Sequence, residues 1–209
     1  MSITLVPSHL ERLPHGVDAP PFDRRHITAG IAHIGVGAFH RAHLAIYTNL
    51  ALADADMAGW GILGINLLDH DKPLAEAFKA QDGLYSVSEF DPQGNRRTHV
   101  VGAMVDYLHA PTDGAKRVLE KLSDPAIRIV SLTITEGGYL IDEHGAFRLA
   151  DDTVAHDLTH PDAPTGVFGF IVGALARRRA ARVPPLPPIS FATPPHTAPH
   201  ATPPVPSFP

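Results

Sequence analysis

Two glycines, Gly35 and Gly37, are separated by one residue and lie between a short apolar run and a helical pattern. In the segment IAHIGVGAFHRAH, the first glycine permits a sharp turn after a strand, and the second lets the backbone approach a pyrophosphate without a Cβ in the way. A helix that begins directly after such a turn offers free N–H groups to phosphate. The third position of this dinucleotide fingerprint holds His40 instead of glycine. The spacing indicates a variant cofactor-binding turn, and an ordinary tight turn is the alternative.

The first turn of the expected helix also carries Arg41, whose guanidinium can pair with a phosphate; a solvated surface residue is the alternative. His40 and His43 are three residues apart, which is half of a metal site. The chain has no cysteine, and no third ligand suggests itself. We therefore expect no metal.

Asp69 directly follows the apolar run WGILGINLL, and Asp71 comes two residues later. An acid at the end of the strand after the glycine turn can accept hydrogen bonds from a ribose diol. Such an acid favours NAD over NADP, because it repels a 2′-phosphate. Asp69 is the stronger candidate, since it lies nearer the strand end. The alternative is that both aspartates cap the helix that starts near Lys72.

A third candidate segment, TITEGGY, follows the most strand-like run of the chain, IRIVSL. Open α/β sheets bind ligands at the carboxyl ends of their strands. Glu136 in this segment can bind ribose or nicotinamide, or handle a proton near the reacting centre. A plain junction between strand and turn is the alternative.

The elements that would position these residues alternate along the chain. Apolar runs predict strands at 31–35, 60–68 and 127–135, and helical periodicity predicts helices at 38–57, 72–80, 112–122 and 165–182. Between them, 84–90 and 96–104 flank turn-forming residues and predict an inserted antiparallel hairpin. We therefore expect an α/β fold, with a Rossmann-like, mostly parallel sheet and helices on both faces.

Composition limits the function classes. The chain has 209 residues, enough for one substantial domain, and its net charge of −5 with no dense basic block outside 177–179 argues against a nucleic-acid partner. Residues 1–30 do not resemble a signal peptide, and no apolar run is long enough to cross a membrane. We therefore expect a cytoplasmic protein without a membrane partner.

Proline divides the chain. Of its 21 prolines, 11 lie within residues 184–209, where no helix or central strand can run through. We therefore expect a lead-in at 1–30, one cofactor-binding domain at 31–183 and a disordered, proline-rich tail at 184–209.

Three segments together resemble a known family. GIAHIGVGAFHRAHLAIYTNL, WGILGINLLDHDKPLAEAFKAQDGLYSV and IRIVSLTITEGGYLID are similar, in order and spacing, to the long-chain polyol dehydrogenases. This mannitol dehydrogenase family includes mannitol 2-dehydrogenases, fructuronate reductases and arabinitol dehydrogenases. The resemblance runs from about Pro21 to Val183.

The resemblance implies an N-terminal Rossmann-like domain that binds NAD and needs no metal. It implies a cofactor turn, a region that selects NAD and a nicotinamide end with Glu136 near the route of the reaction proton. The residues assigned to these three parts are Gly35, Gly37, Phe39 and Arg41, then Asp69 and Asp71, then Thr135 and Glu136. The implied substrate is a small polyol or a sugar acid.

The chain departs from the family after Val183. The family continues into a helical domain with a catalytic lysine and an Asn-x-x-His pair, whereas the last lysine here is Lys121. We therefore assign no catalytic residue and expect the chain alone to be inactive. A frameshift or truncation near residue 183 is the leading explanation, which predicts that another reading frame of the gene restores the missing motifs. A non-catalytic NAD-binding module is the second reading, and a methyltransferase is a third, weaker one.

Overall fold

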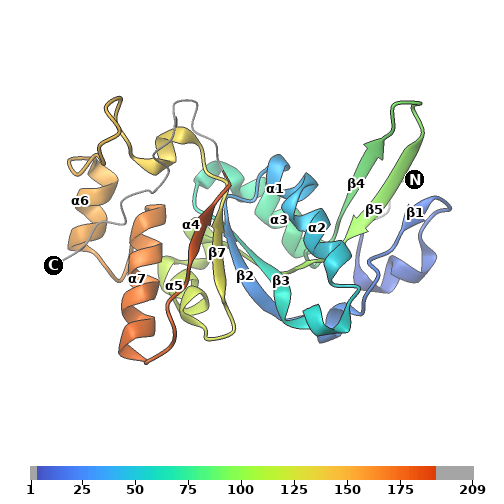
Figure 1. The fold of residues 1–209 in the computed structure, drawn as a ribbon, viewed down its shortest axis with the longest axis horizontal. Coiled ribbons are helices and arrows are strands. Elements are labelled where there is room, and N and C mark those ends of the chain that lie inside the picture. The colour runs from blue at the N-terminus through green and yellow to red at the C-terminus, as the bar shows by residue number, and fades with distance from the viewer. Residues whose placement is uncertain (1–3, 192–209) are drawn as a thin grey trace.

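The computed structural model describes residues 4–191, except for the side chain of Glu136. Its centre is a five-stranded parallel sheet in the order β6-β3-β2-β7-β8. The strands are β2 (Ala29–Ile34), β3 (Gly61–Asn66), β6 (Met104–His109), β7 (Ile129–Leu132) and β8 (Pro188–Ser190). The chain moves outward from β2 to one side and then restarts at β7 on the other (Figure 1). This confirms the predicted Rossmann-like arrangement.

Helices cover both faces of this sheet, because alternate residues of each central strand point to opposite sides. On one face, Ala32 and Leu63 pack with α5 (Ala115–Ser123) and α7 (Val167–Ala180). On the other, apolar residues of β3 pack with α2 (Leu44–Ala51), and apolar residues of β6 pack with α3 (Lys72–Ala80). Figure 1 shows these two helix layers on either side of the strands. All six residues of β3 are buried, as expected for a strand covered on both faces.

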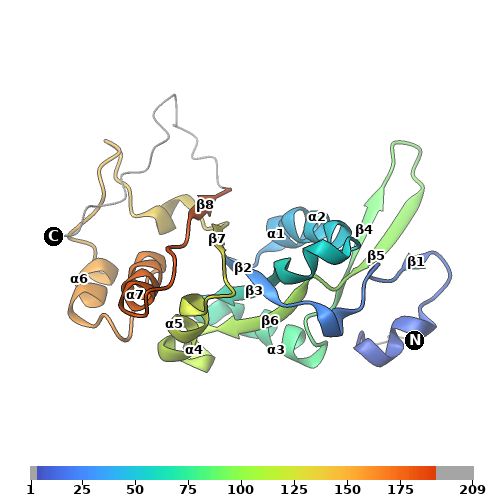
Figure 2. The ribbon, with the colours of Figure 1, turned by 60° about the horizontal axis from the view of Figure 1, so that its bottom comes forward.

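The predicted hairpin is confirmed and belongs to a second, smaller sheet. β4 (Tyr85–Phe90) and β5 (Arg96–Val101) pair antiparallel, and β1 (Val17–Asp18) lies parallel to β5. The lead-in at 1–30 therefore contributes a strand of its own. Figure 2 shows the hairpin projecting from one end of the molecule.

Two of the predicted helices are interrupted. The run 38–57 is not one helix: α1 (Ala38–Ala42) is separated from α2 by His43, and a 3₁₀ helix, η3 (Ala55–Trp60), follows. His43 leaves the helical region, and its ring donates a hydrogen bond to the carbonyl of Phe39. The run 112–122 is likewise divided by Gly114, whose φ is +85°, into α4 (Ala110–Asp113) and α5.

The strand β6 and the helix α6 were also not predicted from the sequence. The expected strand at 96–104 is two strands, because Gly102 and Ala103 separate β5 from β6, which turns into the large sheet. The helix α6 (Asp152–Thr159) is capped by the preceding residue, Asp151, whose carboxylate accepts a hydrogen bond from the Thr153 N–H. Figure 2 shows α6 beside α7.

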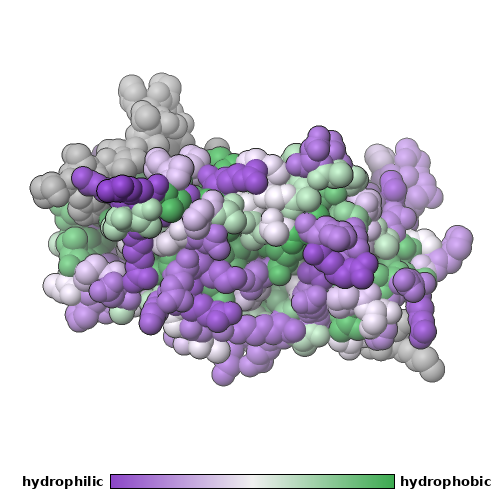
Figure 3. Space-filling model, turned by 90° about the horizontal axis from the view of Figure 1, so that it is seen from below, coloured by the Kyte–Doolittle hydropathy of each residue, from purple (hydrophilic) through white to green (hydrophobic). Residues whose placement is uncertain are grey.

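The first residues of the expected tail belong to the fold. β8 pairs with β7 at the edge of the large sheet, and Leu186 is buried. Pro188 is tolerated there because an edge strand has one side without a ladder partner. The rest of the predicted tail, 192–209, lies outside the described residues. Within residues 4–191, no helix is both long enough and apolar enough to span a membrane. The face in Figure 3 is mostly hydrophilic, with apolar side chains between.

Candidate functional site

The glycine turn follows β2 directly, and its first glycine has two structural reasons to be glycine. Gly35 has a φ of +95°, and a Cβ there would lie 2.5 Å from the backbone oxygen of Thr133. Gly37 differs: its backbone is extended, and the nearest atom to a Cβ would be the Gly35 oxygen, at 3.9 Å. The described chain therefore does not itself require glycine at position 37. A Cβ-free backbone at the start of α1 is what a closely approaching pyrophosphate requires.

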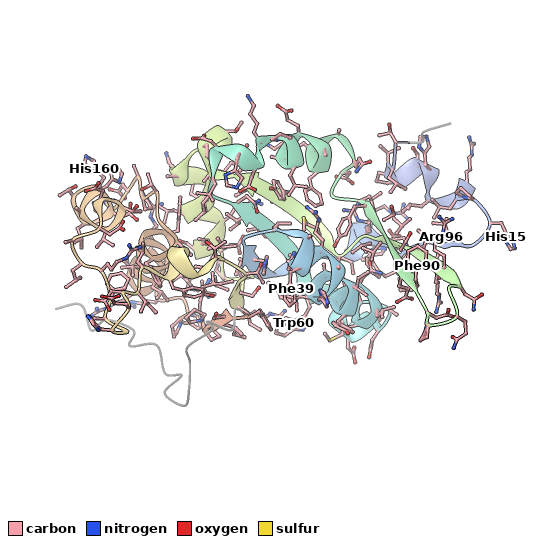
Figure 4. The ribbon with its side chains drawn as sticks, turned by 90° about the horizontal axis from the view of Figure 1, so that it is seen from above. His15, Phe39, Trp60, Phe90, Arg96 and His160 are labelled. Carbon is pink, nitrogen blue, oxygen red and sulfur yellow. The ribbon has the colours of Figure 1, made fainter. Side chains whose placement is uncertain are left out.

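Helix α1 begins at Ala38, and the N–H groups of its first turn have no partner within the helix. Phe39 is exposed beside this end (Figure 4). Arg41 is half-buried, and its guanidinium makes no hydrogen bond or ion pair with the described residues. Free N–H groups with an uncommitted cation beside them form a suitable site for an anion.

His40, in the third fingerprint position, lies flat against His33 of β2, with ring centroids 3.6 Å apart. Both imidazoles are fully buried. Burial lowers the pKa of His40 to about 4 and that of His33 to about 2, so both are neutral near pH 7. His43, by contrast, is exposed and stacks on Phe39. Among the described residues, no three metal-binding side chains cluster.

Asp69 and Asp71 follow β3 in a 3₁₀ turn, η4 (Asp69–Asp71). Neither aspartate caps α3 through its side chain, so the capping alternative has no hydrogen bond to support it. Buried His109 holds the start of this turn in place, because its Nε2 donates a hydrogen bond to the carbonyl of Leu68 at 2.9 Å. Tyr107 lies on the same strand as His109; burial and the charge of Asp71 raise the pKa of its phenol.

The TITEGGY segment leaves β7, which ends at Leu132 and is shorter than the predicted strand 127–135. Thr135 is exposed and precedes a 3₁₀ helix, η5 (Glu136–Tyr139). The side chain of Glu136 lies outside the described atoms, so its predicted role has no geometry here.

The three motifs lie together at the carboxyl ends of neighbouring parallel strands. In the parallel register, Ile34 of β2 pairs with Ile65 of β3 on one side and with Leu132 of β7 on the other. The glycine turn therefore lies between the Asp69 turn and the Thr135 segment. The chain reverses its strand order between β2 and β7, and open α/β sheets bind ligands at such a switch point.

The buried polar residues that support this end of the sheet were not predicted from the sequence. Asn66, the last residue of β3, accepts a hydrogen bond from the Val36 N–H at 2.7 Å and fixes the glycine turn. His33, His109 and Asn66 are all polar residues inside apolar strand runs. A polar residue inside an apolar run was the signal available in the sequence, because a buried polar side chain needs a hydrogen-bond partner. The sequence does not indicate which residue that partner is.

Comparison with known proteins gives a consistent result. The family model described as the mannitol dehydrogenase Rossmann domain matches residues 29–190. The chain is 51% identical over 175 residues to the polyol:NADP oxidoreductase of Gluconobacter oxydans, which covers 82% of this chain and 36% of that protein. It is 46% identical over 173 residues to the mannitol 2-dehydrogenase of Cereibacter sphaeroides, covering 83% and 36%. The chain thus spans about a third of the length of these relatives.

A solved structure shares the fold. The Pseudomonas fluorescens mannitol 2-dehydrogenase, in a ternary complex with NAD and D-mannitol, superposes with a TM-score of 0.86 at 40% sequence identity. The match covers 90% of this chain and 38% of that one.

Proposed function

The chain belongs to the mannitol dehydrogenase family, and we therefore propose that it binds NAD at the carboxyl ends of β3, β2 and β7, as the cofactor-binding part of a polyol dehydrogenase. The observation that carries the proposal is the meeting of three motifs at the switch point of the sheet. The open backbone at Gly37 fits a dinucleotide, because the described chain leaves that position free of steric demand.

We assign the cofactor residues as follows. The pyrophosphate binds the first turn of α1, between Gly35 and Gly37 and beside Phe39 and Arg41. The adenosine ribose binds on the β3 side, at Asp69 ahead of Asp71. The nicotinamide end lies on the β7 side, at Thr135 and Glu136, with Glu136 on the path of the reaction proton. This order follows the rule that the acid after the second strand binds the ribose.

The substrate class follows from the relatives. Their names give polyols and mannitol, so we propose a polyol–ketose or related sugar-acid interconversion for the whole enzyme. Bound NAD supplies the hydride acceptor for that oxidation. A positioned base must take the hydroxyl proton at the same time, and donors must stabilise the developing charge on oxygen. We assign neither role to a residue of these 209, and propose that this chain binds cofactor without turning over substrate.

Preference for NAD over NADP is part of the proposal. A carboxylate at Asp69 repels a 2′-phosphate, whereas one relative carries NADP in its name and another was solved with NAD. The two cofactors therefore have to be compared directly in this chain.

The test is calorimetry of the purified chain with NAD and with NADP, followed by an assay for NADH formation with mannitol, arabinitol and sorbitol. We expect saturable NAD binding, weaker NADP binding and no NADH. Absence of NAD binding would contradict the proposal. Turnover of any polyol would show that the chain is a complete enzyme, and binding of S-adenosylmethionine in preference to NAD would indicate a methyltransferase.

A further inference from the structure

A buried imidazole connects the cofactor turn to the neighbouring strand. His33 of β2 is fully buried between two hydroxyl side chains, that of Ser131 in β7 and that of Thr133 just after it. Its Nδ1 lies 2.8 Å from Ser131 Oγ, and its Nε2 lies 2.8 Å from Thr133 Oγ1. Thr133 Oγ1 in turn lies 2.6 Å from the carbonyl oxygen of Gly35. The series of hydrogen bonds therefore ends on the first glycine of the turn.

The chemistry of the groups determines the direction of every bond in this series. The Gly35 carbonyl can only accept, so Thr133 donates its hydroxyl hydrogen to it. Thr133 Oγ1 is then the acceptor for His33, which requires a hydrogen on Nε2. In a neutral imidazole Nδ1 then carries none and accepts from the Ser131 hydroxyl. The arrangement specifies a single tautomer, with each ring nitrogen paired.

The imidazole of His40, in α1, packs against this series of hydrogen bonds. Its ring lies over His33 at an interplanar angle of 11°, and neither of its nitrogens has a hydrogen-bond partner among the described residues. In the usual fingerprint, glycine at this position permits close packing of helix on strand. Here two flat rings in contact take its place, and they keep His33 fully buried beneath α1.

We propose that His33 and Thr133 are positioning residues that hold the Gly35 peptide in the orientation required for pyrophosphate binding. The inference rests on the proposed NAD site and adds residues that do not touch the cofactor. The Gly35 oxygen accepts two hydrogen bonds, one from Thr133 and one from the Gly37 N–H at 2.7 Å. Together they fix the direction of the peptide that leads into the N–H groups of α1. Without the Thr133 hydroxyl, the Gly35 carbonyl accepts a hydrogen bond only from the Gly37 N–H, and the turn becomes more flexible.

The test is a pair of substitutions at one position, Thr133→Val and Thr133→Ser, in the full chain. NAD is titrated by calorimetry, and adenosine, which has no phosphate, by NMR. We expect Thr133→Val to weaken NAD binding by about tenfold, the equivalent of roughly one hydrogen bond. Adenosine binding stays unchanged, and Thr133→Ser restores NAD affinity. The matched control is Thr48→Val in α2, which removes another hydroxyl that donates to a carbonyl, that of Leu44.

The outcomes separate this inference from the proposed function. A wild-type chain that does not bind NAD overturns both. A wild-type chain that binds NAD, with a folded Thr133→Val variant of equal affinity, overturns only the inference. Equal loss of NAD and adenosine binding also overturns it, because the effect is then general loosening of the fold.

A measurement on the unmutated chain keeps the inference testable if Thr133→Val does not fold. The ¹⁵N shifts of the His33 ring report which nitrogen carries the hydrogen. We expect the Nε2–H form near pH 7, with or without NAD. The Nδ1–H form would reverse the direction of the series and overturn the inference.

Discussion

The backbone oxygen of Thr133 lies in the space that a side chain at Gly35 would occupy, 2.5 Å from its Cβ position. β7 and β2 are neighbours in the sheet, so the turn after β2 lies beside the residue that follows β7. The close approach brings the Thr133 hydroxyl within reach of the Gly35 carbonyl. Thr133 therefore demands glycine at position 35 through its backbone oxygen and orients the turn through its hydroxyl.

The substitution Gly35→Ala is expected to destabilise the fold. Alanine has to adopt a φ of +95° and also displace the Thr133 backbone, which together cost about 2–4 kcal/mol. Urea unfolding followed by the fluorescence of Trp60 measures the loss. A free energy of unfolding within about 0.5 kcal/mol of wild type, the range of neutral surface changes, would contradict the steric argument.

The substitution Gly37→Ala is expected to leave stability nearly unchanged but to weaken NAD binding. Its Cβ meets only the Gly35 oxygen, at 3.9 Å, so stability should change by less than about 0.5 kcal/mol. NAD binding should weaken by about tenfold or more, because the methyl group lies where the pyrophosphate approaches the backbone. Calorimetry with NAD measures the change. Unaltered affinity would remove Gly37 from the cofactor site.

The substitution Asp69→Ala is expected to reduce the preference for NAD. Loss of the carboxylate removes two acceptors for the ribose diol and the repulsion of a 2′-phosphate, so NAD affinity falls and NADP affinity rises. The ratio of the two dissociation constants is the readout. Asp71→Ala serves as the comparison, and a larger change of the ratio there would exchange the roles of the two aspartates.

Stability is expected to rise with pH between about 4 and 6.5. The folded chain holds His40 at a pKa of about 4, below its usual 6.5, so in this window the unfolded chain binds more protons than the folded one. Because the buried ring stays neutral, the free energy of unfolding decreases progressively as the pH falls, by about 3 kcal/mol in total. His33, with its pKa at about 2, adds a loss of the same sign.

Urea unfolding at a series of pH values from 4.5 to 7.5 measures this dependence. The variant His40→Phe keeps a flat ring on His33 and should show a shallower slope over the same range. The exposed His43 is the control, and His43→Gln should leave the slope unchanged. Equal slopes in wild type and His40→Phe would show that His40 is not the residue responsible.

Local patterns in the sequence were sufficient to establish the α/β class and to propose the three cofactor motifs. The helix predicted at 72–80 agrees with α3, because its periodicity and its proline in the first turn are local signals. The break at His43 was missed because no glycine or proline marks it in the sequence of residues 38–57. β6 was missed because only Gly102 and Ala103 separate it from the hairpin, and its partner is β3, far away in sequence.

By itself, the sequence determined which residues can do chemistry: two glycines after a strand, an acid after the next strand, and a polar segment after a third. Only the tertiary structure decided that these segments share one edge, because that depends on the strand order, which periodicity does not encode. It also decided what His33 does. Its partners Ser131 and Thr133 are 98 and 100 residues away, and strand pairing alone brings them to the imidazole.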